Sequence, residues 1–525
     1  PNLPMKLQNV NDLQQGTKRS RREFFRYGLA LLFVAGIMIY SSLGLGITGQ
    51  QGILLVVAAM IGGYMAMNIG ANDVANNVGP AVGSQSISMG WAIVIAAIFE
   101  MAGAIIAGGD VISTVRGDII DMSYVPDSDH FIALMTAALL AGALWLNLAT
   151  ALGAPVSTTH SIVGAVLGAG LAAGGFAAAN WPVMGKIAAS WVISPVMGGL
   201  IAAGFLLWIK RAITYKTDMV EAARRTVPIL IGVMAFSFTT YLMLKGLSKV
   251  WKVDFYTAAA IGLVMGLVLW LLMRKLLTRR ASQLNNTKKA INSLFIVPLI
   301  FAAALLSFAH GANDVANAIG PLAAIADTVL RGGVSDQAGI PLWVLLIGAF
   351  GIALGLALYG PKLIRTVGGE ITDLDQMRAF SVAMAAAITV IIASQLGLPV
   401  SSTHIAIGGI FGVGFLRERL KSNYSRMLEE IKHHHSGADK EIVEAFLDRF
   451  AAADVATKQT MLKELKAHEA DIELSKKEYK KIRKVYKNEL VKRTAVTKIV
   501  AAWIITVPAS ALLAAIIYWL MASLL

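Results

Sequence analysis

Two sets of amide and acidic side chains lie inside stretches that are otherwise apolar. The sets are Asn72, Asp73 and Asn76, and Asn313, Asp314 and Asn317. An ionisable group inside an apolar span is costly, so its presence indicates function. Carboxylate, amide and freed backbone carbonyl oxygens suit a hard cation such as Na⁺. We therefore expect both sets to bind a cation, with helix packing through Asn and Gly as the alternative.

Glycine and proline flank each set and are expected to loosen the helix at both ends, which would free backbone carbonyls. The flanking residues are Gly70 with Gly79–Pro80, and Gly311 with Gly320–Pro321. This expectation concerns local geometry, and the structure can test it directly.

Two trios of hydroxyl side chains each follow a Gly-x-Pro break. The trios are Ser157, Thr158 and Thr159, and Ser401, Ser402 and Thr403. Pro155 and Pro399 predict a chain break and a helix start, with Ser157 or Ser401 as the N-cap. A helix N-terminus presents free N–H groups and a partial positive charge, which suits an anion. Two such ends facing each other would hold a small tetrahedral oxyanion; two ordinary capped helices are the alternative.

One further acid, Glu100, lies in the middle of an apolar stretch. Its counterpart in the second half of the chain is apolar, near Ile352. This asymmetry favours a second cation site or a proton-linked gate, and a locally hydrogen-bonded Glu is the alternative.

The histidines give weaker signals. His160 and His404 are expected either to pack or to contact substrate, and His310 is expected to be structural. His433, His434 and His435 are expected to form a solvated loop rather than a metal site.

The charge of the predicted site constrains its mechanism. The motif stretches contain no Lys or Arg. Asp73, Asp314 and a bound anion would place several negative charges in a medium of low dielectric constant, which is prohibitive without compensation. Helix dipoles supply only about half a charge each. Cations must therefore enter with the anion, which favours cation–anion symport over an anion channel or an exchanger built on basic residues.

The motifs recur in the same order along the chain. Residues 70–80 (GANDVANNVGP) match residues 311–321 (GANDVANAIGP), and residues 153–160 (GAPVSTTH) match residues 397–404 (GLPVSSTH). Weaker echoes pair residues 114–118 with 366–370, and residues 191–195 with 503–508. A simple count puts seven membrane crossings between the copies, so they should run in opposite directions. Such inverted duplication is typical of secondary transporters, with the substrate site near the membrane midplane.

Composition places the chain in a membrane. Of its 525 residues, 56% are hydrophobic and 15% are charged, whereas soluble proteins have about 45–50% and about 25%. Of the 78 charged residues (46 + 32), 33 lie in residues 417–495. The absence of cysteine excludes disulfides, thiolate metal sites and cysteine nucleophiles. The net charge is +14. In a membrane protein such an excess of Lys and Arg indicates basic loops on the cytoplasmic side rather than a nucleic-acid-binding surface.

Thirteen apolar stretches are long enough to predict membrane spans. They are residues 27–48, 53–78, 90–109, 131–152, 155–175, 187–209, 228–246, 255–273, 294–320, 341–361, 379–397, 399–416 and 496–523. The weakest are 155–175 and 399–416, which follow their neighbours so closely that each could be a re-entrant hairpin. We expect an all-α polytopic membrane protein with inverted-topology repeats, about 12–13 spans, broken helices or re-entrant hairpins at the midplane, and a hydrophilic helical insert in the cytoplasm.

The charge distribution also predicts domains and orientation. The domains are a basic N-terminal tail (1–26), an extra N-terminal helix (27–50), repeat 1 (51–210), linking helices and basic loops (211–293), the first part of repeat 2 (294–416), a cytoplasmic helical insert (417–495) and the last helix of repeat 2 (496–525). The main Lys/Arg clusters predict a cytoplasmic N-terminus and insert, with the C-terminus outside. A short basic set at residues 245–252 disagrees.

The duplicated motifs resemble the inorganic phosphate transporter (PiT) family over most of residues 50–416 and 495–523. The resemblance implies an inverted-repeat fold, commonly dimeric, that moves phosphate with Na⁺ or H⁺. By motif, the family's phosphate and cation ligands would fall on Asp73, Asn76, Asp314, Asn317, Ser157, Thr158, Ser401 and Ser402, and Glu100 matches a functional Glu of many members. Both copies read Asn-Asp-Val-Ala-Asn, as in sodium-coupled members. Some relatives carry sulfate, and no residue separates sulfate from phosphate.

Three hypotheses follow. The first is a Na⁺-coupled phosphate symporter that works by alternating access in the inner membrane of a bacterium, as a homodimer among membrane lipids, without a covalent cofactor, enzymatic activity or nucleic-acid partner. An H⁺-coupled phosphate or sulfate permease of the same fold is its variant. The second is an intramembrane enzyme acting on phospholipid head groups. The third is a channel or a receptor-like sensor that uses the insert.

Overall fold

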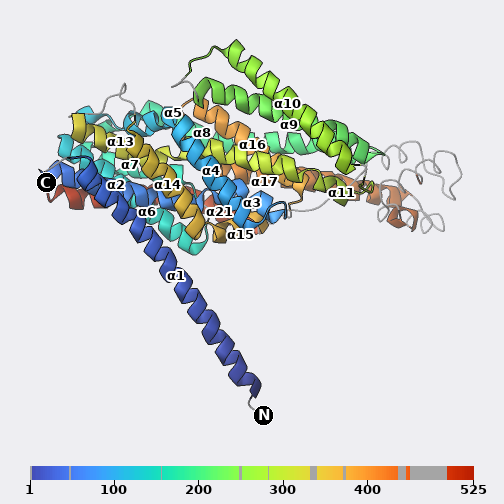
Figure 1. Cartoon of the computed structure of the whole chain (residues 1–525), viewed down its shortest axis with the longest axis horizontal. Helices are drawn as coiled ribbons and strands as arrows, with labels where there is room; N and C mark the ends of the chain where they lie inside the picture. The colour runs from blue at the N-terminus through green and yellow to red at the C-terminus, as the bar shows by residue number, and fades with distance from the viewer. Residues whose placement is uncertain are drawn as a thin grey trace.

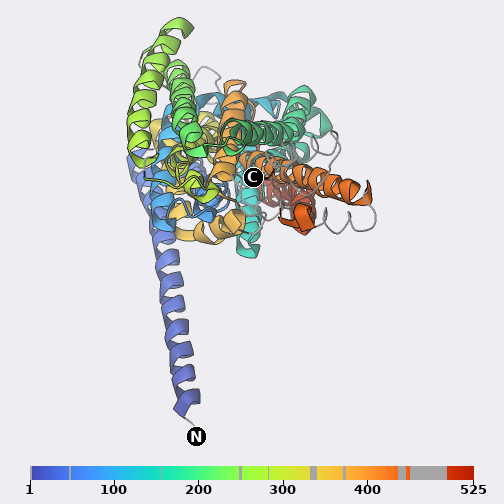
Figure 2. The same cartoon turned by 90° about the vertical axis from the view of Figure 1, so that its right-hand side faces the viewer.

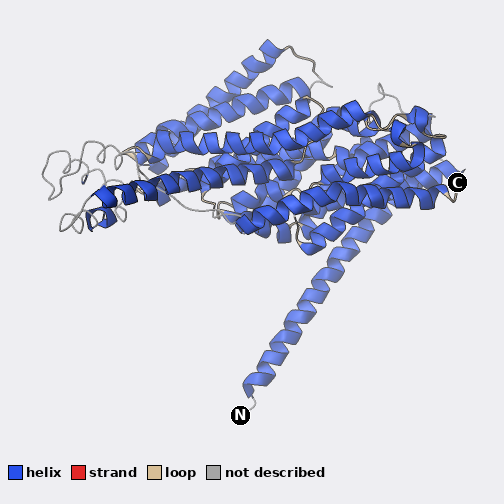
Figure 3. Cartoon of the chain, turned by 180° about the vertical axis from the view of Figure 1, so that it is seen from behind, coloured by secondary structure: helices blue, strands red, loops and turns tan. Residues whose placement is uncertain are grey.

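The computed structural model describes residues 3–46, 49–154, 156–246, 251–281, 283–331, 340–369, 374–434, 445–449, 461 and 493–525. Within these ranges every named element is a helix, as Figure 3 shows, and one isolated bridge pairs Ile120 with Ala179. The first half of the chain forms α1 (Leu3–Gly44), α2 (Gly49–Asn72), α3 (Ala75–Gly83), α4 (Met89–Ala107), α5 (Gly109–Ser113), η1 (Thr114–Asp118), η2 (Met122–Tyr124), α6 (Ser128–Leu152), α7 (Thr158–Gly174), η3 (Phe176–Ala178), α8 (Trp181–Ile209), η4 (Lys210–Thr214), α9 (Met219–Tyr241) and η5 (Leu242–Gly246). The second half forms α10 (Phe255–Ala281), α11 (Lys288–Ser293), α12 (Ile296–Asp314), α13 (Ala316–Arg331), α14 (Leu342–Tyr359), α15 (Pro361–Gly369), α16 (Gln376–Gln395), α17 (Ser402–His434) and α21 (Arg493–Ala522).

Eleven helical stretches of the described chain are long and apolar enough to cross a membrane, which confirms the all-α membrane class. The eleven coincide with eleven of the thirteen predicted stretches. The two that do not qualify are 155–175 and 399–416, the weakest of the set. The first is present as the 17-residue apolar helix α7, and the second forms the start of α17.

The helices that carry the two aspartates are broken at the aspartates. The first helix ends at Asn72 and the next begins at Ala75; in the second copy α12 ends at Asp314 and α13 begins at Ala316. The expectation that the flanking glycines and prolines loosen the helix was wrong. Gly70 lies inside α2, and Pro80 lies inside α3.

Gly70 and Gly311 instead allow two helices to approach closely. A Cβ at Gly70 would overlap the backbone carbonyl of Ile352, and a Cβ at Gly311 would overlap that of Glu100. Only glycine leaves room for backbones at such short range. The matched contacts also confirm that Ile352 stands where Glu100 stands in the other half.

Equivalent helices of the two halves pack in equivalent ways. In one set of pairs, α2 packs on α14 as α12 packs on α4; in the other, α7 packs on α21 as α17 packs on α8. Every one of these pairs joins a helix of the first half to a helix of the second. The halves are therefore interleaved, and their shared interface lies at the broken helices. The opposite direction of the two copies stays a prediction.

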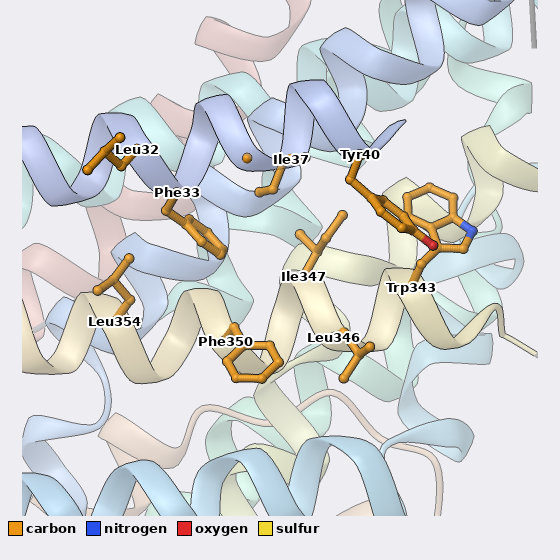
Figure 4. A pocket seen from close by; sticks show the side chains of 10 residues that line it. Leu32, Phe33, Ile37, Tyr40, Trp343, Leu346, Ile347, Phe350 and Leu354 are labelled. Carbon is orange, nitrogen blue, oxygen red and sulfur yellow. The ribbon is translucent and has the colours of Figure 1, made fainter. Parts of the chain in front are cut away.

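Two peripheral parts flank this interleaved body. The hairpin of α9 and α10 packs along one side of it (Figures 1 and 2). On another side, α1 packs on α2 and α14, and its N-terminal half extends away from the other helices (Figure 1). Figure 4 shows the apolar side chains between α1 and α14, which line a cavity of about 590 Å³ and include Phe33, Ile37 and Ile347.

The predicted insert is only partly described. The helix α17 continues without a break past residue 416 to His434, so the end of repeat 2 and the start of the insert form one helix. His433 and His434 lie at the end of that helix, and their side chains, like His435, lie outside the described residues. Most of residues 435–492 lie outside the described residues as well, so the helical character predicted there stays a prediction.

Candidate functional site

The polar motifs of both halves meet at one buried place. The broken helices α2–α3 and α12–α13 supply the aspartates and the amide groups, and α4 supplies Glu100. The N-termini of α7 and α17 supply the hydroxyls. Every predicted member is at most 1% exposed: Asn72, Asp73, Asn76, Glu100, Ser157, Thr158, Thr159, Asn313, Asp314, Asn317, Ser401, Ser402 and Thr403. The structure thus brings together residues that lie up to 330 positions apart in the chain.

Asp73 is held by hydroxyls from both trios. Its Oδ2 accepts a hydrogen bond from Thr158 Oγ1 at 2.6 Å, and its Oδ1 accepts one from Thr403 Oγ1 at 3.1 Å. Hydrogen bonds to an ionised acceptor are the strong ones. Asp73 therefore joins the start of α7 to the start of α17.

Asp314 has a related but less complete set of partners. Its Oδ2 accepts a hydrogen bond from Ser402 Oγ at 3.0 Å, as Asp73 accepts from Thr158. Its Oδ1 is buried and has no hydrogen-bond partner among the described residues. A buried carboxylate oxygen without a donor is a position that a cation would satisfy.

The second Asn of each motif reaches across to the other half. The amide of Asn76 donates to Thr403 Oγ1 at 2.8 Å. The amide of Asn317 donates to Thr158 Oγ1 and to Thr159 Oγ1, both at 3.1 Å. The Oδ1 atoms of both Asn side chains are buried and lack a partner within the described chain. These oxygens are further candidate cation ligands.

The first Asn of each motif forms hydrogen bonds to the segment that precedes α7 or α17. Asn72 donates to Thr150 Oγ1 at 3.0 Å and to the carbonyl of Ala154 at 3.2 Å. In the same way, Asn313 donates to Ser394 Oγ at 2.9 Å and to the carbonyl of Leu398 at 3.2 Å. The Oδ1 of Asn72 also accepts from the backbone N–H of Val156, so this amide oxygen is already engaged.

Both hydroxyl trios begin with the predicted N-cap. The backbone N–H of His160 donates to Ser157 Oγ at 3.0 Å, and that of His404 donates to Ser401 Oγ at 3.1 Å. The caps fix where α7 and α17 begin, and the hydroxyls of Thr158 and Ser402 in their first turns contact the aspartates. The two buried helix N-termini therefore lie beside the acidic cluster, with their partial positive charge.

A chain of polar groups leads from α3 through Glu100 to Asp314. The amide of Asn77 donates to Glu100 Oε1 at 2.6 Å. The other oxygen of Glu100 lies 2.7 Å from His310 Nδ1, and His310 Nε2 lies 2.8 Å from Asp314 Oδ2. Glu100 and His310 are both fully buried. The imidazole thus bridges two carboxyl groups.

Sequence reasoning missed the place of His310 and Asn77 in this site. His310 was expected to be structural, and it lies at the centre of the cluster. Its position four residues before Asp314 was a usable signal, because residues at i and i+4 share a helix face. Its contact with Glu100 arises only from the packing of α4 on α12.

The cluster can hold a cation. Asp73, His310 and Asp314 each place one ligand atom within 4.8 Å of the others. With Glu100, three carboxyl groups surround a single imidazole, and within the described residues no Lys or Arg is paired with them. One protonated imidazole would not neutralise three carboxylates. The excess negative charge in this buried site therefore favours the binding of a cation.

His160 and His404 pack against aromatic rings. The ring centroids of His160 and Trp191 are 3.9 Å apart, and those of His404 and Trp503 are 3.7 Å apart. The two imidazoles also meet edge to face at 4.3 Å. Of the two roles expected for these residues, the structure shows the packing contact.

The chain is similar to known proteins in sequence and in structure. A profile described as "Phosphate transporter family" matches residues 69–514. A Helicobacter pylori protein named "Putative phosphate permease" is 52% identical over 524 residues, which cover 98% of each chain. A Haemophilus influenzae protein of the same name is 38% identical over 380 residues, covering 71% of this chain and 90% of the relative. A solved structure titled "The sodium-dependent phosphate transporter" superposes with a TM-score of 0.73 at 30% identity, covering 90% of this chain and all of the other.

Proposed function

This chain belongs to the phosphate transporter family, and we propose that it imports inorganic phosphate together with Na⁺ by alternating access. The family consists of transporters rather than enzymes, so an enzymatic role on phospholipid head groups is set aside. Phosphate transport is the family's activity; the coupling ion, the direction of transport and the alternating access are the proposed part.

The observation that carries the proposal is the convergence of Asp73 and Asp314 on two capped helix N-termini in a fully buried site. Such a site has donors for a tetrahedral anion and acceptors for cations side by side. Adding phosphate to the three carboxyl groups is prohibitive unless positive charge enters with it. A symporter satisfies that requirement, because the cation and the anion neutralise each other inside the site.

The ligand sets proposed for each ion follow the motifs. For phosphate they are Ser157, Thr158, Thr159, Ser401, Ser402, Thr403, Asp73 and Asp314. For Na⁺ they are Asn72, Asp73, Asn76, Glu100, Asn313, Asp314 and Asn317. The unpartnered oxygens of Asn76, Asp314 and Asn317 support the cation set most directly. Asn72 has the weakest support, because its amide oxygen already accepts a backbone N–H.

Alternating access would use the interleaved halves as the moving parts. The matched helix pairs and matched site contacts support two inverted repeats that rock about the broken helices. We further propose a homodimer in the inner membrane of a bacterium, with the N-terminus and the 417–495 insert in the cytoplasm and the C-terminus outside. The distribution of Lys and Arg supports this orientation.

One observation favours H⁺ as the alternative coupling ion. His310 bridges Glu100 and Asp314, and a buried imidazole between two carboxyl groups is a group that can carry a proton. The solved relative is titled as sodium-dependent, and this title supports Na⁺ for the present chain.

The decisive experiment is uptake of radiolabelled phosphate into proteoliposomes. An inward Na⁺ gradient and an inward pH gradient are imposed separately, with sulfate as competitor. We expect concentrative uptake with the Na⁺ gradient alone, and the competition by sulfate measures the anion selectivity. Uptake driven only by the pH gradient would transfer the coupling to H⁺, and uptake that never exceeds equilibrium would indicate a channel.

A further inference from the structure

A cleft with both polar and apolar walls opens beside the buried site, between α1 and the rest of the molecule. Its volume is about 950 Å³, and α1, α2, α6 and the end of α14 with α15 form its walls. Figure 1 shows α1 lying against α2 and α14. Of its lining residues, only Ala71 belongs to the two duplicated motifs.

The floor of the cleft leads to the substrate site through paired polar side chains. On α2, Asn68 lies one helical turn before Asn72. The amide of Asn147 on α6 donates to Asn68 Oδ1 at 3.3 Å, and one turn further along, Asn72 donates to Thr150 Oγ1 at 3.0 Å. Asn72 is the residue next to Asp73. The pairs thus form a polar ladder from the cleft to the helix break.

The second half of the chain has no such ladder. The positions equivalent to Asn68 and Asn147 are Ala309 and Ile391, by the offsets of the two motifs. Only the last rung is kept in both halves, as Thr150 in one and Ser394 in the other. A polar route of this kind is therefore a feature of the first half alone and is not part of the contacts that both halves share.

The mouth of the cleft is basic. Arg26, Lys362 and Arg365 line it, with Glu23 as the one acidic residue. Arg26 pairs with Glu23 at 2.8 Å, and Lys362 Nζ donates to the carbonyl of Ala151 at 2.7 Å. Arg365 is exposed and has no ion-pair partner in the part of the chain that the structure describes. A concave surface with excess positive charge concentrates anions.

We propose that this cleft binds a phosphate group at Arg365, Lys362 and Arg26, as a station between solution and the buried site. The inference rests on the proposed function, since it gives the transported anion a second binding place on its path. Guanidinium groups match the geometry of phosphate oxygens. The same chemistry would also accept the head group of an anionic phospholipid lying against α1, so the two sources of the phosphate group must be separated.

The chain contains no cysteine, so a single introduced thiol reports on the cleft without interference. Ala151 is exposed and lines the cleft. Ala151→Cys in the purified full-length protein is modified with a water-soluble maleimide, with and without inorganic phosphate or a short-chain phosphatidylglycerol. We expect inorganic phosphate to slow modification about three- to tenfold, the range of a few exposed charge contacts. This protection should weaken at high ionic strength.

Four further variants make the result specific. Adding Arg365→Gln to Ala151→Cys should abolish protection, and Arg365→Lys should restore part of it. Ser123→Cys, at an exposed position of the short helix η2, should show no protection. Asn147→Ile, which gives the first half the residue of the second, should leave protection intact and slow phosphate uptake in proteoliposomes.

The outcomes separate the sources and the hypotheses. Protection by inorganic phosphate assigns the cleft to the transported anion, and protection by the lipid alone assigns it to a head group. No protection by either, or equal protection with Arg365→Gln, overturns the proposal. Repeating the measurement with Asp73→Asn keeps it independent of transport. A failure of wild-type uptake would count against the proposed function and would leave the thiol result standing.

Discussion

The two halves of the site share a frame and differ in the charge around their aspartates. In both halves, the first Asn of the motif bonds to the segment that precedes α7 or α17. A hydroxyl in the first turn of that helix donates to the aspartate. The second Asn donates to a hydroxyl of the other half. Only Asp314 is also contacted by an imidazole. The residues that make this difference are Asn77, Glu100 and His310, and their counterparts are Ala318, Ile352 and Ile69.

This difference separates two roles of the duplicated motifs, which are to set the geometry of the site and to set its charge. The shared contacts set the geometry, since they place two carboxyl groups and two helix N-termini around one small space. The unshared chain of polar groups from Asn77 to Asp314 makes direct contact with one aspartate only. The two aspartates therefore offer unequal environments to a cation: Asp73 has hydroxyl donors on both oxygens, and Asp314 has a free oxygen beside a bridged one.

Removing the charge of either aspartate should have the largest effect. For Asp73→Asn and for Asp314→Asn we expect Na⁺-driven phosphate uptake to fall about 10- to 100-fold, because a hydrogen bond to a charged group contributes about 1.5–3 kcal/mol and each 1.4 kcal/mol is tenfold. Uptake is compared at equal amounts of folded, monodisperse protein. Asp121→Asn, in an exposed loop, serves as the matched control and should transport normally. Normal uptake in both site variants would remove these residues from the transport mechanism.

Breaking the unshared chain should come next. Glu100→Gln leaves His310 facing an uncharged group, and disrupting a buried ion pair costs about 3–5 kcal/mol. We expect a lower unfolding temperature in detergent and phosphate uptake reduced about tenfold.

The counterpart position supplies the comparison. Ile352→Val removes one methylene group at a fully buried site and should cost about 0.5–1.5 kcal/mol, with uptake retained. Similar losses of uptake in Glu100→Gln and Ile352→Val would mean that the packing at these positions, rather than the charge of Glu100, matters for transport. The difference between the two halves would then have no role in transport.

Much of this arrangement was predictable from residues alone. The caps at Ser157 and Ser401 follow from a hydroxyl placed after Gly-x-Pro, which is a local signal. The weakness of residues 155–175 and 399–416 as spans follows from their length and flanking breaks. The asymmetry at Glu100 and Ile352 follows from aligning the two copies.

The rest depends on contacts that no local pattern encodes. Asn76 meets Thr403, 327 positions away, only because the two halves interleave. Helix propensity placed the breaks at glycine and proline, whereas tertiary hydrogen bonds to Asp73 hold the break at the aspartate itself. His310 needed α4 to pack on α12 before its second carboxyl partner was present.

The shared frame can be tested separately through its two closest helix crossings. Gly70→Ala and Gly311→Ala each place a Cβ against a backbone carbonyl that cannot move aside easily. Overpacking of this kind costs about 1–3 kcal/mol, so both variants should unfold at lower temperature in detergent. Equal shifts would support equivalent crossings in the two halves.

An open glycine provides the control for that measurement. Gly204 lies in α8 with nothing within 4 Å of an added Cβ. Gly204→Ala should be neutral or stabilising by up to about 1 kcal/mol, since alanine favours a helix. A loss as large as that of Gly70→Ala would show that helix composition, and not close approach, controls the result.

The smallest expected effect on phosphate uptake concerns the helix caps, and it distinguishes stability from anion binding. Ser157→Ala with Ser401→Ala removes two caps, each worth about 0.5–2 kcal/mol, and should raise the phosphate concentration for half-maximal uptake about two- to fivefold. Ser88 caps α4 at an exposed position, so Ser88→Ala should lower stability without changing that concentration. Because both kinds of variant lose a cap, only a change confined to the first reports contact with the anion. An unchanged half-maximal concentration in the double variant would mean that these two helix ends do not face the substrate, and the frame would then position the aspartates alone.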